Sequence, residues 1–241
     1  MAIQKIDDIY EALKANSKKK RLVVAYANDS HSIEAVNKAV ELGIVEATLC
    51  GDENEIKKVC AEHGFDISRF KIVHEPVDTK AAAKAVQMVR EKEADFIMKG
   101  LVSTDKYMRA ILNKDCGLLP PKATLSHVVV MECPNYHKLL VFGDAAIIPA
   151  PDFSQKMAIV KYVSQIANAL GVQRPKVAMI SATEQVLPKV ESTTDAAILA
   201  KMGERGQLGP IRPHRTARRS SKRGSSLKMH RSLKVLRWKR R

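Results

Sequence analysis

Hydrophobic and polar positions follow two rhythms along roughly the first two hundred residues of this 241-residue chain. Short runs rich in Val and Ile alternate with longer segments in which apolar residues recur every three or four positions. The first rhythm is typical of strands buried on both faces, and the second is typical of amphipathic helices. Their alternation predicts an α/β fold with largely parallel sheets and helices on both faces.

The helix expected at 31–43 illustrates the pattern. Ile33, Val36 and Val40 fall on one of its faces, and Gly43 ends it. On the same reasoning we expect strands at 21–27, 45–51, 69–75, 94–100 and 176–181, and further helices at 54–64, 78–93, 152–170 and 193–202.

The rhythm changes from Lys122 onward. The stretch ATLSHVVVMECPNYHKLLVFGDAAI places two apolar runs around CPNYHK, with no room for a crossover helix. An antiparallel hairpin is therefore predicted here. We use this change to divide the chain into an N-terminal α/β lobe at 1–133 and a second α/β lobe at 134–208.

Composition excludes several classes of protein. No apolar run approaches the eighteen or so residues of a membrane span, and the N-terminus lacks the basic-then-apolar order of a signal peptide. The four cysteines show no C-x-x-C spacing, and the seven histidines show no metal spacing. We therefore expect a cytoplasmic protein with reduced cysteines, no bound metal and no membrane partner.

Positive charge is concentrated at the C-terminus. Residues 209–241 carry thirteen of the 41 Lys and Arg residues and no Asp or Glu, whereas the formal net charge of the whole chain is +15. The rest of the chain is thus nearly neutral, which indicates a basic appendage rather than a basic body. One interpretation is an arm that binds nucleic acid, with Trp238 stacking on a base.

The segment FIMKGLVSTDKYMR, at 96–109, is the first candidate for chemistry, because ligands bind beyond the carboxyl ends of parallel strands. Gly100 follows Lys99 and would let the backbone approach a ligand, while Ser103 and Thr104 open a helix whose free N–H groups favour an anion. Arg109 could then reach a phosphate. An ordinary Ser/Thr helix cap with a solvated Lys and Arg is an equal alternative.

Two later segments follow strands in the same way. Asp144 directly follows an apolar strand and could place its carboxylate at the floor of a cleft. A turn-forming aspartate is an equal alternative. Ser181 and Thr183 could contact a ligand, although a polar loop is the favoured interpretation. His127 fits a strand residue better than a base.

Five motifs in order carry a resemblance that spacing alone does not supply. They are MKGLVSTDKYMRAILNK, LSHVVVMECPNYHKLLVFGDAAI, PDFSQK, ALGVQRPKVAMISATEQVLPKVESTTDAAILAKM and RGQ. From about residue 20 to Gln207 the chain resembles the phosphate acetyl/butyryl transferase family, closest to its butyryl-transferring members. The resemblance implies a two-lobed fold of the isopropylmalate-dehydrogenase type, with coenzyme A and acyl phosphate in the cleft between the lobes.

The implied reaction is reversible transfer of a butyryl or similar short acyl group between coenzyme A and inorganic phosphate. Coenzyme A would be a substrate, no tightly bound cofactor is expected, and intact relatives are usually homo-oligomers. By position, Arg109 matches the family arginine that faces the phosphoryl group, and Asp144 matches the aspartate of an F-x-D-x-A stretch. We assign these two as catalytic, with the substrate-binding set Lys99, Gly100, Ser103, Thr104, Ser181 and Thr183.

The resemblance also gives the basic tail a second interpretation. Relatives continue after RGQ into a D-G-P-L-A-L-D stretch and a later S-R segment that supplies much of the thiol-activating site, and this chain has neither. We favour a shift of reading frame near codon 208 over a functional arm. On that hypothesis the C-terminal part of the fold is missing, residues 209–241 are disordered, and the chain lacks activity.

Overall fold

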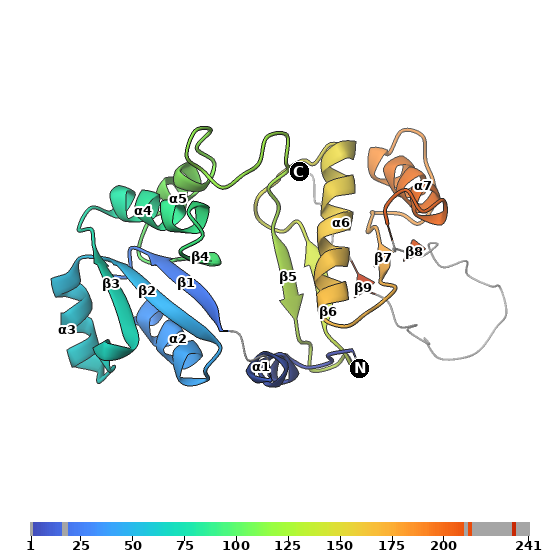
Figure 1. Ribbon diagram of the computed structural model, residues 1–241. Helices are drawn as coiled ribbons and strands as arrows, with labels where there is room; N and C mark the ends of the chain where they lie inside the picture. Colours follow the sequence, from blue (N-terminus) through green and yellow to red (C-terminus); the bar gives the residue numbers. More distant parts are fainter. Residues whose placement is uncertain (1, 16–18, 210–211, 214–232, 235–241) are drawn as a thin grey trace. The chain divides into compact units, whose positions relative to one another are not determined.

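The computed structural model describes residues 2–15, 19–209, 212–213 and 233–234 (Figure 1). Most of the basic tail lies outside these residues, so the structure tests neither interpretation of it. Contacts divide the chain into two compact units. We call Tyr10–Ala123 the sheet unit, and the described residues up to Ile9 together with those from Thr124 onward the hairpin unit.

The sheet unit is built on four parallel strands in the order β3–β2–β1–β4. The strands are β1 (Lys20–Ala25), β2 (Val45–Gly51), β3 (Phe70–His74) and β4 (Phe96–Lys99). The helices that belong to it are α2 (Ser30–Glu41), α3 (Glu53–His63), α4 (Asp78–Arg90) and α5 (Thr104–Ile111), with a 3-10 turn η1 (Ile67–Arg69) before β3. The α/β class with a parallel sheet is confirmed.

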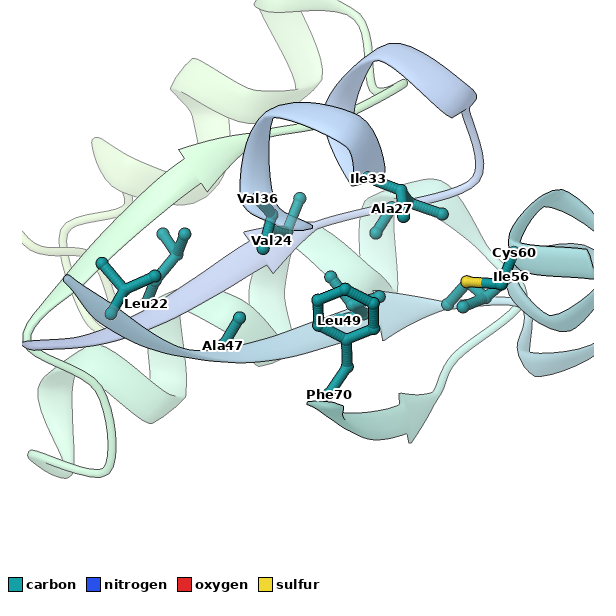
Figure 2. Packing of buried hydrophobic residues seen from close by; sticks show 11 residues of the cluster. Leu22, Val24, Ala27, Ile33, Val36, Ala47, Leu49, Ile56, Cys60 and Phe70 are labelled. Atoms are coloured by element: carbon teal, nitrogen blue, oxygen red, sulfur yellow. The ribbon is translucent and has the colours of Figure 1, made fainter. Parts of the chain in front are cut away.

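Alternate side chains of the central strand β1 enter different cores. Leu22 and Val24 pack with residues of α2 and α3, a cluster that Figure 2 shows around Leu49. Val23 and Ala25 point to the opposite face and join a second cluster, which includes three alanines of α4. Because a strand projects successive side chains to opposite faces, an uninterrupted apolar run is what a strand covered by helices on both sides requires.

Aspartate side chains cap the starts of α2 and α3. The carboxylate of Asp29 accepts from the N–H of Ser32 at the start of α2, and that of Asp52 accepts from the N–H of Asn54 at the start of α3. Gly64 ends α3 in the left-handed region, with φ 70°. Such caps satisfy backbone groups that a helix end leaves unpaired.

The hairpin unit begins with the antiparallel pair that the sequence predicts. Strand β5 (Val128–Met131) runs against β6 (Leu140–Gly143), with Val129 opposite Phe142. These strands lie in one unit, so the contact division at 123/124 differs from the predicted lobe boundary at 133/134. A boundary at 133 would cut between two hydrogen-bonded strands.

The N-terminal residues also pack with this unit. The N–H of Ile3 donates to the carbonyl of Leu170, and the N–H of Ile6, at the start of α1 (Ile6–Lys14), donates to the carboxylate of Glu132. The predicted first lobe included these residues, and no sequence pattern signals contacts over such a separation.

The remaining elements of the hairpin unit are α6, three short parallel strands and α7. Helix α6 (Phe153–Ala169) starts with a capping box between Asp152 and Gln155. Strand β7 (Lys176–Ala178) pairs in parallel with β8 (Arg212–Pro213) and β9 (Leu233–Lys234), two dipeptides within the tail that was expected to be disordered. Helix α7 (Glu191–Glu204) follows a loop after β7.

Core burial in the sheet unit gives a stability prediction. Leu49 is completely buried, whereas Leu101 is 58% exposed. Leu49→Ala should lower the free energy of unfolding by about 2–5 kcal/mol, because it removes a packed side chain and leaves a cavity. Leu101→Ala is the matched control and should change it by less than about 0.5 kcal/mol. Urea unfolding followed by circular dichroism tests both, and equal losses would contradict this account of the core.

Candidate functional site

The order of strands in the sheet unit singles out one edge as the place for a ligand. β2 and β3 lie on one side of β1 and β4 lies on the other, so the direction of strand addition reverses between β1 and β4. Ligands of open parallel sheets bind at the carboxyl ends of the strands beside such a reversal. The segment from Lys99 to Thr104 joins the last residue of β4 to the first residue of α5 and therefore lies at this edge.

Gly100 is required at this edge by its contact with β1. A Cβ atom on Gly100 would lie 2.3 Å from the carbonyl oxygen of Tyr26 and 2.9 Å from that of Ala25. The N–H of Gly100 donates to the carbonyl oxygen of Ala25, and the N–H of Leu101 donates to that of Tyr26. The close approach that was expected toward a ligand is thus made, in this structure, to the end of β1.

Ser103 and Thr104 begin α5 as the sequence suggests. The hydroxyl of Ser103 accepts from the N–H of Lys106, which makes Ser103 the N-cap and Thr104 the first helical residue. The capping interpretation is confirmed for Ser103. A side-chain cap satisfies one of the first N–H groups of a helix, so the anion-binding interpretation stays a prediction.

Three cationic side chains lie at or near this turn, and their partners differ. Arg109 lies in the last turn of α5, where its Nε is 3.0 Å from the carboxylate of Asp105; the two side chains are 80% and 70% exposed. The ammonium of Lys106 is 2.6 Å from Asp78 in the first turn of α4. The ammonium of Lys99 is 3.5 Å from the carbonyl oxygen of Gly100.

Asp144 accepts four hydrogen bonds at the carboxyl end of β6. One carboxylate oxygen accepts from the N–H groups of Ala146 and Ile147, both at 2.8 Å. The other accepts from the hydroxyl of Ser126 at 2.9 Å and from the N–H of His127 at 3.1 Å. The side chain therefore joins the residues before β5 to the loop after β6.

These contacts set the ionisation of Asp144. Burial would raise the pKa of this carboxyl, but the donors on Ile147, Ala146, His127 and Ser126 outweigh burial and lower the pKa below its usual value. A carboxylate with a lowered pKa and four donors is a weak proton acceptor. The geometry supports a role in positioning, and the catalytic assignment stays a prediction.

Ser181 and Thr183 lie in the loop after β7 and bond within the hairpin unit. The hydroxyl oxygens of Ser181 and Ser192 are 2.7 Å apart, and the hydroxyl of Thr183 accepts from the N–H of Gln185 at 3.2 Å. The Thr183 contact is local, as a polar loop predicts, whereas the Ser181 contact joins the loop to α7. Their assignment to substrate binding stays a prediction.

Sequence reasoning missed the ion pairs that join α6 to α7. The ammonium of Lys156 is 2.5 Å from Asp195 and 2.8 Å from Glu191, and the Lys156 and Asp195 side chains are only 14% and 11% exposed. Thr193 lies inside α7, where its hydroxyl is 3.0 Å from the carbonyl oxygen of Leu187 and 2.8 Å from that of Val190. Lys156 stands in the motif PDFSQK, but the sequence does not indicate partners so far along the chain.

The predicted site residues thus fall into two groups, one in each unit. The turn 99–104 and Arg109 belong to the sheet unit, and Asp144, Ser181 and Thr183 belong to the hairpin unit. Among the described residues, no cluster of three or more His, Cys, Asp or Glu side chains could hold a metal ion. The helices in this part of the chain are all too short or too polar to cross a membrane.

Comparisons with known proteins agree on one family. The sequence profile described as phosphate acetyl/butaryl transferase matches residues 5–83 and 68–209. The chain is 44% identical, over 81% of its length, to a phosphate butyryltransferase from Clostridium acetobutylicum, and 38% identical over 80% to a phosphate acetyltransferase from Thermotoga maritima.

A solved structure shares the fold. A branched-chain phosphotransacylase from Enterococcus faecalis superimposes with a TM-score of 0.64 at 26% identity, over 76% of this chain and 63% of that protein. The matches cover 65% of each of the two curated relatives, so this chain spans slightly less than two thirds of their length. The comparisons lend no support to a polyanion-binding protein as the alternative.

The four hydrogen bonds of Asp144 give the prediction for this site. Asp144→Asn should lower the free energy of unfolding at pH 7 by about 1.5–3 kcal/mol, because an amide keeps one oxygen and turns an N–H group toward donors. A lowered pKa in the folded state stabilises the protein above the unfolded value of about 4, and this stability is lost as the pH falls below it. The difference between the two proteins should therefore shrink as the pH falls below about 4.

The control is Glu184→Gln, which neutralises an exposed carboxylate in the same unit. It should shift stability by less than about 0.5 kcal/mol at either pH. A difference between wild type and Asp144→Asn that stays constant down to pH 3 would contradict the role given to the carboxylate charge.

Proposed function

Since the chain belongs to the phosphate acetyl/butyryl transferase family, we propose that it transfers a butyryl or similar short acyl group reversibly between coenzyme A and inorganic phosphate. The observation that carries the proposal is the profile match, which extends over residues 5–209. Identity of 44% to an enzyme named phosphate butyryltransferase favours the butyryl type.

The chemistry of this reaction defines what the site must supply. A phosphate oxygen attacks the thioester carbonyl of acyl-CoA, the carbonyl oxygen becomes an oxyanion, and the thiolate of coenzyme A leaves as the acyl phosphate forms. Positive charge must hold the phosphate dianion close to the carbonyl, and donors must stabilise the oxyanion. The departing thiolate also requires a proton or an electrostatic partner.

We assign the phosphate to the edge of the sheet unit. Lys99 and Arg109 provide the positive charge, and the first turn of α5, beginning at Ser103 and Thr104, adds N–H groups with the favourable end of the helix dipole. Gly100 supports this arrangement by letting the turn lie against β1. Asp144 acts as a positioning residue in the hairpin unit, where Ser181 and Thr183 are offered as substrate contacts.

Further properties follow from the proposal. Coenzyme A is a substrate that leaves after each turnover, and no tightly bound cofactor is required. A reducing compartment such as the cytoplasm fits four free cysteines, of which Cys50 and Cys60 are buried. Assembly into homo-oligomers rests on resemblance to the family alone.

An assay of thiol release tests the function. Butyryl-CoA and phosphate are mixed with the 241-residue chain, or with a chimera that continues after residue 209 with the corresponding segment of the Clostridium acetobutylicum enzyme. The chimera should release free thiol only when phosphate is present. The frame-shift hypothesis predicts turnover by the chimera and none by the chain itself. A folded chimera without phosphate-dependent turnover would oppose the proposed reaction.

Arg109 is tested in whichever of these proteins turns over. Arg109→Ala should raise the KM for phosphate about 10- to 100-fold, since a charge-assisted hydrogen bond contributes about 1.5–3 kcal/mol and each 1.4 kcal/mol is a factor of ten. The control is Lys57→Ala, which removes an exposed cation paired with Glu53 at the same helical spacing. It should leave the phosphate KM unchanged. An unaltered KM in Arg109→Ala would remove Arg109 from the site.

A further inference from the structure

Asp105 forms an ion pair with Arg109, the side chain that the proposed function assigns to phosphate. Its carboxylate is 3.0 Å from Nε of Arg109, one helical turn away in α5. Both side chains are more than two thirds exposed, so water competes for each of them. Exposed pairs at this spacing contribute little to stability, and a better anion can displace the carboxylate.

Phosphate is such an anion. Near neutral pH it carries more charge than a carboxylate, and its oxygens can accept two parallel N–H bonds from a guanidinium. Asp105 lies directly after Thr104, within the first turn of the helix expected to receive the phosphate. A bound phosphate therefore takes a partner away from Asp105 and is repelled by its charge.

The neighbouring cations show why this competition is confined to Arg109. Lys106 of α5 forms an ion pair with Asp78 of α4, and the Lys106 ammonium lowers the pKa of the Asp78 carboxyl. Its bond joins α5 to α4, so Lys106 serves the packing of the unit. Within the described residues, Lys99 has no carboxylate within 4.0 Å. Lys99 is thus open to an anion, whereas Arg109 must first be released.

We propose that Asp105 is a counter-ion that phosphate displaces from Arg109, and that it thereby sets the phosphate affinity of the site. Asp105 is a specificity-determining residue in this account, because an anion binds only if it is a better partner for the guanidinium than a carboxylate one turn away. The inference rests on the proposed function, since it assumes that phosphate binds at Arg109.

The direction in which Asp105→Asn changes the affinity for phosphate separates this role from a structural one. An acidic side chain in the first turn stabilises a helix, so a purely structural Asp105 predicts that Asp105→Asn loosens α5 and weakens phosphate binding. A counter-ion predicts tighter binding. Freeing Arg109 accounts for about a twofold gain, and removal of the repulsion adds to it, so the Kd for phosphate should fall roughly threefold to tenfold.

The test is equilibrium dialysis of radiolabelled inorganic phosphate against the 241-residue chain at fixed ionic strength. Asp105→Asn should tighten binding, and Asp105→Glu, which keeps the charge, should stay within about twofold of wild type. Glu53→Gln is the matched control, because Glu53 is also a first-turn acid paired at i,i+4 with a cation, Lys57, at 2.6 Å. It should leave the Kd unchanged.

A double-mutant cycle ties the effect to Arg109. If Asp105 acts through this guanidinium, Asp105→Asn should have its full effect in wild type and a much smaller effect in Arg109→Ala. Circular dichroism verifies the fold of each variant. Asp105→Ser, which also removes the carboxylate, replaces Asp105→Asn if the latter does not fold.

The outcomes distinguish the two levels of the argument. If Arg109→Ala weakens phosphate binding but Asp105→Asn does not tighten it, the counter-ion role is overturned and the phosphate site stands. Equal tightening by Glu53→Gln also overturns it, since net charge alone then explains the gain. If wild type does not bind phosphate, or Arg109→Ala binds it equally well, both the clamp and the counter-ion role fail.

Discussion

Burial of both faces of β1 is the constraint on which the sheet unit depends. Val23, Val24 and Ala25 are completely buried, so helices must cover each side of this strand. Partner strands must also flank it, because an unpaired backbone in such a position would lose its hydrogen bonds. The end of the strand, and with it the proposed ligand edge, is thereby fixed by the most buried part of the unit.

Most of the sheet unit could be predicted from sequence, because its rules are local. The strand expected at 45–51 is found at those residues, α2 and α3 end close to Gly43 and Gly64, and polar side chains cap the starts of α2, α3 and α5. The N-terminal segment was harder to assign, since Ile3 contacts Leu170 and nothing local indicates this. Prediction failed where a contact joins residues that are far apart in sequence and neither residue type requires it.

The candidate site shows the same division. The Ser103 cap and the charges of α5 could be inferred from a short stretch of sequence, because a helix relates residues three and four positions apart. The four donors around Asp144 could not, since they come from both sides of a hairpin and depend on the loop that the carboxylate itself holds. Likewise, the ion pairs of Lys156 could not be predicted from sequence, because they depend on how α6 packs against α7.

The packing of Gly100 against β1 also limits how this turn can evolve. A Cβ atom at position 100 would meet backbone carbonyls, which cannot move aside as a flexible side chain could. The neighbouring Leu101 points largely into solvent and meets no such barrier. Substitutions should therefore be tolerated at position 101 and not at position 100. The shape of the turn would then persist while the side chains on its surface change.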